Sequence, residues 1–497
     1  MRDDPGPENR LVTIRESRLR RIRFSTRSLV RSEEDPNPFE RIKRRRYQGG
    51  PFRVCLHTAG LTALSAEQSL ILGEICAPYR RRAIELAAPT PGDPPETWNT
   101  PAPFQIERWN EDAGSFFATI GETKLSAGFP APARAWSFEA VQRLSLMPEQ
   151  RAQAIQILIA AAIGDAELII TGDQHLLSLR DLHPFKSRPI ASPHEAFPIL
   201  GAWSRAIDES YLTGWLNISD WYPHVLAHAV LKESWADFAV LLEAAAISNG
   251  DVISDTAGSI RFRLAQAIDA LERLMLKWLC RSHDGGLSEL DQIVLGVSAI
   301  QDNLALLAME FLGVSGSELR PHERSFRVEK WRSAIAARGE QGRRLCDDIE
   351  EARPWLRVSE ELRHQAVHRN VLGRVRYERE GVRNDAIILP PPLANAIKRV
   401  LGELHQPPPS WGLTPTRLHG DETEYLDPLP FGARLVAGTA HLINRVVRRL
   451  DPRGDARYPD EVRKAAISGE PRFMKDEMFS AENCEVAILC GPLSGLV

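Results

Sequence analysis

Arginine and histidine recur at helical spacing in the segment Val358–His368, which has the sequence VSEELRHQAVH. An arginine presents a planar fork of N–H donors that matches phosphate oxygens, and a histidine titrates near neutral pH and can move protons. Arg363, His364 and His368 are therefore candidates for holding and cleaving a phosphodiester. Positions five apart on a helix differ by about 140° around its axis, so Arg363 would have to curl across the helix to meet His368.

Two other interpretations of this segment stay open. The first is the charged outer face of an ordinary amphipathic helix. The second is a metal site, because Glu360, His364 and His368 follow one another at four-residue intervals and share a helix face. No glutamate lies inside the His-x-x-x-His, so the segment is not the zinc-protease helix.

A second stretch that can carry chemistry is LIITGDQHLL, Leu168–Leu177. Its apolar residues predict a short buried strand that stops at Thr171-Gly172-Asp173. A parallel strand that ends this way puts the carboxylate of Asp173 at the carboxyl edge of a sheet, where open α/β folds bind ligands. The alternative is a turn aspartate that caps the next helix.

Length and composition predict a folded protein with more than one domain. The chain has 497 residues, of which 43% are hydrophobic and 26% charged, which is the balance of a globular protein. We expect a basic, flexible arm over residues 1–50, an α/β domain over 51–200, a helical domain over 201–451 and a turn-rich tail over 452–497.

Hydrophobic periodicity indicates the elements of both domains. Phe52–Leu61 has the pattern of a strand, whereas residues 88–104 contain too much proline for a helix or a central strand. Apolar residues recur every three or four positions from Ile260 to Trp278 and from Ile293 to Phe311, which predicts two long helices. Further helices are expected over residues 328–349, 357–372, 393–404 and 431–450, with loops around the proline-rich stretches between the last three.

The charge is unevenly distributed. A formal net charge of −4 argues against a protein that coats nucleic acid over its whole surface. Arginine is nevertheless frequent in the first 50 residues, and Arg44, Arg45 and Arg46 are candidate nucleic-acid contacts. The other interpretation of this basic segment is a solvated tail.

Cysteine usage and hydropathy bear on the compartment. The six cysteines are scattered, without a Cys-x-x-Cys pair or zinc-finger spacing, as in proteins of a reducing cytoplasm. The longest apolar run, Ile155–Ile163, is far shorter than the roughly 20 residues of a membrane helix, and no signal peptide is evident. We therefore expect a cytoplasmic protein with no membrane partner.

The stretch from residue 168 to residue 197 resembles the C-terminal half of PIN-like domains, a nuclease superfamily. In that family a strand ends in T-G/N-D, here Thr171 to Asp173, and a later strand and helix follow the pattern I-x-S/T-P-x-E-F, here within RPIASPHEAF. The resemblance implies a three-layer α/β fold with a parallel sheet, and Mg²⁺ or Mn²⁺ bound by carboxylates that include Asp173.

This chain departs from the PIN-like pattern at the other metal ligands. His57 stands where the first strand of the family ends in an aspartate. A further aspartate position falls near Gln153 or Gln156, and the mid-domain acid would come from Glu107, Glu111 or Glu122. We therefore expect a degenerate domain that binds RNA or a partner, with Mg²⁺ or Mn²⁺ needed only if the site is active.

The Arg363-His364-x-x-x-His368 segment resembles the R-[N/D/H]-x(3–6)-H motif of HEPN domains, all-α helical bundles that include metal-independent ribonucleases of toxin and antiviral systems. The resemblance implies an endoribonuclease that needs no cofactor. Arg363 would neutralise the scissile phosphate, and His368 would act as general acid or base on the 2′-hydroxyl or the leaving oxygen.

The same resemblance implies partners. RNA would be the substrate, an antitoxin or defence protein could restrain the enzyme, and two copies of the motif would meet across a homodimer seam with Val358, Leu362 and Val367 as candidate contacts. The alternatives are a non-catalytic nucleic-acid-binding or assembly protein and a metal-dependent PIN nuclease.

Overall fold

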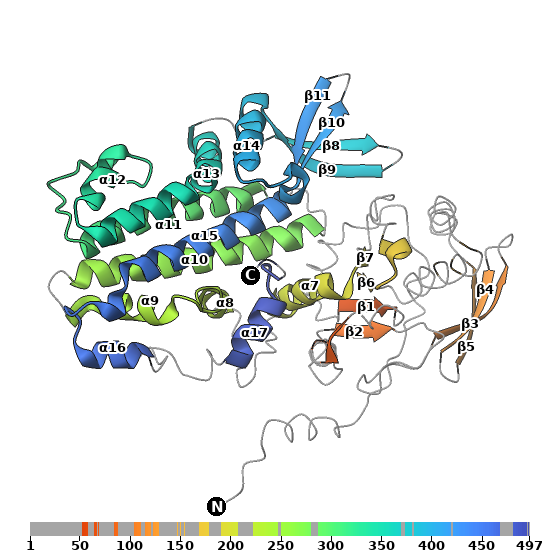
Figure 1. Ribbon diagram of the computed structural model, residues 1–497. Coiled ribbons are helices and arrows are strands. Elements are labelled where there is room, and N and C mark those ends of the chain that lie inside the picture. The colour runs from red at the N-terminus through yellow and green to blue at the C-terminus, as the bar shows by residue number, and fades with distance from the viewer. Residues whose placement is uncertain are drawn as a thin grey trace, which may run out of the picture. The chain divides into compact units, whose positions relative to one another are not determined.

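The chain divides into two compact units, one of residues 1–211 with 378–383 and the other of residues 212–377 with 384–497. A computed structural model (Figure 1) describes residues 52–57, 64–66, 68, 84–87, 104–110, 115–120, 123–128, 147, 150, 154, 168–177, 190–206, 222–246, 250–279, 287–368, 373–379, 382–418, 421–467, 481–494 and 496. Each unit is described by itself.

The first unit contains two small sheets. Its parallel sheet has the strand order β2-β1-β6-β7, from Ile84–Ala87, Phe52–Leu56, Leu168–Ile170 and Ile190–Ala191. Its antiparallel sheet has the order β3-β4-β5, from Phe104–Asn110, Ser115–Ile120 and Thr123–Gly128. Helix α7, Pro193–Ala206, begins with a capping box in which Ser192 and Glu195 accept each other's backbone N–H groups.

The expected fold class is wrong. The described residues are mostly helical, the parallel strands are two to five residues long, and no three-layer parallel α/β sheet of PIN type is present among the residues that the structure describes. The second unit is not an all-α bundle either, because it includes a four-stranded sheet of order β10-β11-β9-β8.

The second unit is built from helices around one apolar core. Its helices are α8 (Tyr222–Val230), α9 (Trp235–Leu242), α10 (Gly250–Leu279), α11 (Leu287–Phe311), α12 (Glu329–Ala336), α13 (Glu340–His368), α14 (Pro391–Glu403), α15 (Pro428–Leu450), α16 (Asp460–Ile467) and α17 (Ala481–Leu489). Among the described residues, 3₁₀ turns lie at Ala244–Ala246, Pro321–Glu323, Pro408–Trp411 and Pro452–Gly454. The strands are β8 (Gly373–Arg379), β9 (Val382–Leu389), β10 (Leu413–Leu418) and β11 (Asp421–Leu426).

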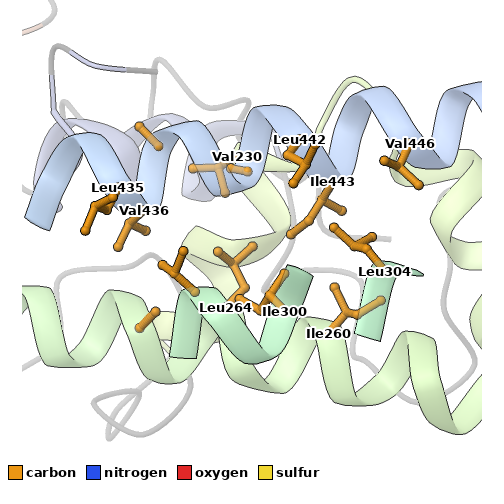
Figure 2. Packing of buried hydrophobic residues seen from close by; sticks show 14 of the residues in the cluster. Val230, Ile260, Leu264, Ile300, Leu304, Leu435, Val436, Leu442, Ile443 and Val446 are labelled. Atoms are coloured by element: carbon orange, nitrogen blue, oxygen red, sulfur yellow. The ribbon is translucent and has the colours of Figure 1, made fainter. Parts of the chain in front are cut away.

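The core of the second unit lies between α10, α11 and α15. The periodic apolar residues of α10 and α11 are buried as the sequence predicted, and Figure 2 shows Ile260, Leu264, Ile300 and Leu304 meeting Ile443 and its neighbours on α15. Each such side chain contributes roughly 1.5–3 kcal/mol on burial, so this contact is a principal source of stability. Helix α11 is long and apolar enough to cross a membrane by length and composition alone, but most of it packs into this core.

The helices after α11 differ from the expected ones at their ends. A break was expected between residues 349 and 357, yet α13 runs through Pro354 without interruption. The break lies earlier, at Gly339, whose backbone adopts a positive φ of 98° that suits glycine. The proline-rich stretches around α14 were expected to be loops, but Pro391 and Pro392 form the first turn of α14, and Pro408 and Pro409 belong to a 3₁₀ turn that precedes β10. The tail, expected to be turn-rich, contains α16 and α17.

Candidate functional site

Arg363 lies near the C-terminal end of α13 and faces α11. Its guanidinium donates a hydrogen bond from Nη1 to Oδ2 of Asp302 at 3.0 Å. The two side chains are 39% and 36% exposed, so water reaches both partners of this ion pair. Exposed pairs of this kind contribute about 0–1 kcal/mol, and an anionic ligand can replace the carboxylate at small cost.

A buried polar network fixes the preceding turn of α13. The amide of Gln301 on α11 donates to the hydroxyl of Ser359 at 2.8 Å and accepts from Nη2 of Arg327 at 2.9 Å. Ser359 is buried and also donates to the carbonyl of Leu356. Arg327 in turn lies 3.8 Å from a carboxylate oxygen of Glu360. Because a buried polar group left without a partner costs about 1–3 kcal/mol, this network sets how α13 is rotated against α11.

The two histidines of the motif lie in the last turns of α13. His364 and His368 both belong to the helix, which ends at His368, but their side chains lie outside the described residues. The backbone alone sets these positions four residues apart, on one face of the helix.

Two of the three residues expected to form a dimer seam do not face outward. Val358 and Leu362 are both buried in the core of the second unit, because they continue the stripe of α13 that packs on α11. The prediction that these two side chains contact a second copy is therefore wrong. The side chain of Val367 lies outside the described residues.

In the first unit, three polar residues meet at the carboxyl edge of the parallel sheet. His57 follows β1, and its Nδ1 lies 2.8 Å from the hydroxyl of Thr171, the residue that follows β6. That hydroxyl accepts the backbone N–H of Asp173 at 3.0 Å, and the carboxylate of Asp173 accepts the N–H of His175 at 2.8 Å. The parallel pairing of β1 with β6 brings these chain positions together.

Burial determines the charge state at this edge. The ring of His57 is 3% exposed, and desolvation lowers the pKa of this histidine, while the nearby carboxylate of Asp173 acts in the opposite direction. The imidazole is therefore neutral at pH 7. Its Nδ1 is engaged with Thr171, so His57 serves as an internal hydrogen-bonding residue where the PIN-like pattern has an acid.

The described residues at this edge do not by themselves form a magnesium or manganese site. Mg²⁺ takes several oxygen ligands, and the described residues that follow these strands include two carboxylates, Asp173 and Glu195, each of which already accepts a backbone N–H. Across the described residues, no group of three or more histidine, cysteine, aspartate or glutamate side chains could hold a metal ion. The capping role that the sequence left open for Asp173 is the one its contacts support.

Several predicted residues cannot be placed. Arg44, Arg45 and Arg46 lie outside the described residues, as do Gln153 and Gln156 and the candidate acids Glu111 and Glu122. Glu107 belongs to β3, but its side chain is also outside the described residues.

Sequence reasoning missed Asp302, Gln301 and Arg327. Asp302 is 61 positions from Arg363, and nothing near either residue in the sequence indicates the pair. Gln301 left one signal, because it is a polar residue next to the apolar stripe of a helix that the sequence did predict. A buried amide in such a place needs partners from a neighbouring element.

Comparisons of the chain with protein-family models, with curated proteins and with solved structures gave no match. Function is therefore inferred from the residues themselves. Among the predicted site residues, Arg363 combines a reactive type of side chain with solvent access and an exchangeable partner.

Proposed function

We propose that this chain cleaves RNA without a metal ion, at the C-terminal turns of α13. The observation that carries the proposal is the guanidinium of Arg363, which is partly exposed, pairs with the carboxylate of Asp302 and lies within five positions of two histidines. An arginine in this state is ready to exchange that carboxylate for a phosphate, to which it can donate two parallel hydrogen bonds.

In the proposed reaction a ribose 2′-hydroxyl attacks the adjacent phosphorus. One histidine takes the proton of the hydroxyl, the phosphorus–O5′ bond breaks, and the other histidine gives a proton to the departing O5′. The products are a 2′,3′-cyclic phosphate and a 5′-hydroxyl end. Positions 364 and 368, one helical turn apart, suit such a base and acid, and Arg363 would neutralise the non-bridging oxygens.

Asp302 would compete with the RNA phosphate for the guanidinium of Arg363. Its carboxylate occupies a donor of the same guanidinium that would bind the phosphate. Because the pair is half-exposed, replacing it by a phosphate costs little. An enzyme of this kind fits the toxin or defence setting implied by the motif, and a basic arm with Arg44 to Arg46 would add sequence-independent attraction to RNA.

The test is cleavage of a defined RNA by the full-length chain in EDTA. We expect Arg363→Ala and His368→Ala each to lower the rate by about 10²–10⁴, and an RNA with one 2′-deoxyribose to resist cleavage at that linkage. The control is Arg353→Ala, which removes an exposed arginine of the same helix that pairs with Glu350. Equal activity of the Arg363 and Arg353 variants would refute the proposal.

The variant Asp302→Asn distinguishes RNA binding by Arg363 from a purely structural role of the Arg363–Asp302 ion pair. If the guanidinium binds the scissile phosphate, freeing it should raise RNA affinity by up to about fivefold, the equivalent of an exposed pair. If the pair only joins two helices, the variant loses stability and affinity stays unchanged. RNA binding without cleavage would favour the non-catalytic alternative, and cleavage that requires Mn²⁺ and Asp173 would favour a metal-dependent nuclease.

A further inference from the structure

A cleft of about 520 Å³ opens between α13, α15 and the turn after α8. Helices α13 and α15 lie side by side, and Leu442, Ile443 and Val446 of α15 point into the core (Figure 2). The opposite stripe of α15 therefore faces outward, and its exposed residues His441, Arg445 and Arg448 line the cleft.

One ion pair at the base of the cleft is firmly held. Arg449 donates from Nε and Nη2 to both carboxylate oxygens of Asp348, at 2.5 and 3.1 Å. The side chain of Asp348 is 16% exposed, and this hydrogen bonding raises the pKa of the guanidinium. The two-point contact fixes the geometry of the base.

Two ion pairs at the rim are loose. Arg445 lies 3.1 Å from Glu351, and Arg448 lies 3.3 Å from Glu233. The two glutamate side chains are 71% and 65% exposed. These contacts are longer than the roughly 2.7–2.9 Å of strong charge-assisted hydrogen bonds, so both glutamates can swing into solvent and release their arginines at small cost.

The lining favours a charged ligand over an apolar one. It carries three arginines and three carboxylates, so it becomes net positive when Glu351 and Glu233 turn into solvent. The described residues that line the cleft are all polar or charged, without a phenylalanine, tyrosine, tryptophan or aliphatic side chain among them. Sites for drug-like or base-stacked ligands are mostly apolar, so this cleft suits a hydrated polyanion. His441 and Arg448 are seven residues apart, about 10 Å along the helix, a span that accommodates linked phosphates better than a single one.

We propose that this cleft binds a short polyphosphate chain, with Arg445 and Arg448 exchanging Glu351 and Glu233 for phosphate oxygens. His441 donates to the far end of the chain, and Arg449 stays with Asp348. Recognition rests on the phosphates and not on a base or sugar. The site is independent of the proposed RNA cleavage, because none of its residues is part of the Arg363 site.

The test is isothermal titration calorimetry of the full-length chain with inorganic tripolyphosphate at low ionic strength. We expect saturable binding that Arg445→Ala and Arg448→Ala each weaken by roughly five- to tenfold. Glu351→Gln should instead tighten it by about two- to threefold, since the glutamine keeps the size but no longer competes. The matched control is Arg344→Ala, which removes an exposed arginine of α13 paired with Glu340 outside the cleft.

Three results would overturn the proposal. The first is no saturable binding by the unaltered chain. The second is an equal loss in the Arg344 and Arg445 variants, which would indicate nonspecific attraction. The third is a nucleoside triphosphate that binds while tripolyphosphate does not. The Glu351→Gln gain is a readout that loss of structure could not produce, and circular dichroism of each variant identifies any that fails to fold.

Discussion

His228 offers a direct test of how burial controls charge in the second unit. It lies on α8 with its ring edge-on to the indole of Trp235, the ring centroids 4.0 Å apart. Burial, and to a smaller extent the positive charge of Arg261, lower the pKa of this histidine to about 4. In the unfolded chain the pKa of this histidine returns to near 6.5. Unfolding therefore takes up a proton between these two values, and the stability that the neutral ring provides is lost as the pH falls from about 6.5 to 4.

The magnitude follows from the two pKa values. Between pH 6 and pH 5, the unfolded chain carries most of a proton on His228 and the folded chain almost none. The linkage relation then gives a loss of about 1 kcal/mol over that interval from this residue alone. His224, one turn earlier, is shifted in the same direction by the same two causes and adds to the loss, whereas Asp427, whose pKa burial raises, contributes with the opposite sign, so the effect of His228 is isolated by comparison with a variant.

The assay is urea denaturation of the full-length chain at pH 6 and pH 5, with His228→Gln beside the unaltered protein. Glutamine is uncharged at both values, so the variant should lose about 1 kcal/mol less than the unaltered chain over this step. A second variant, Val252→Ala at an exposed position of α10, is the control, because it neither adds nor removes a titratable group. Identical losses in the His228 variant and the unaltered chain would refute the burial argument.

Three further predictions concern stability and reactivity. Burial raises the pKa of Asp427 to about 6, so the stability linked to its proton is present below pH 4 and lost as the pH rises through 6. The variant Asp427→Asn keeps the cap of α15 and should be more stable than the unaltered chain by about 1–2 kcal/mol at pH 7.5. Denaturant melts should find the two proteins equally stable near pH 4. Gly438→Ala would place a methyl group on the indole of Trp355 and should cost about 1–3 kcal/mol, whereas Gly402→Ala on α14 meets no atom within 4 Å and should be neutral or stabilising by up to about 1 kcal/mol. Burial raises the pKa of Cys484 to about 11, so iodoacetamide labelling followed by mass spectrometry should find this thiol at least about a hundredfold slower in the folded than in the unfolded chain.

The sequence predicted the helices whose apolar residues repeat without interruption. The apolar stripes that begin at Ile260 and Ile293 are buried in α10 and α11. An apolar repeat of 3.6 residues without gaps is the pattern of a helix that buries one face. The prediction of helix ends failed at α13. A break was expected between residues 349 and 357, but the packing of α13 on α11, α12 and α15 holds the helix together across Pro354.

The strands β1 and β6 lie where the sequence predicted strands, but most of the others were missed for a related reason. Segments such as FQIERWN of β3 and VRNDAIIL of β9 mix charged and apolar residues in short runs, and their pairing partners are set by the fold and not by local pattern. The candidate site shows the same limit. Arg363 could be chosen from its neighbours in the chain, but Asp302 and Gln301 become its surroundings only when α11 and α13 pack.

The proline within α13 has a mechanical consequence. The polyphosphate cleft uses Asp348, and the proposed RNA site uses Arg363 on the same helix, about 22 Å further along its axis. Between them Pro354 lacks the N–H that would bond the carbonyl of Glu350, so the helix bends most easily at that turn. A tilt imposed at one end would be absorbed there as bending, which insulates the two ends from each other's motion.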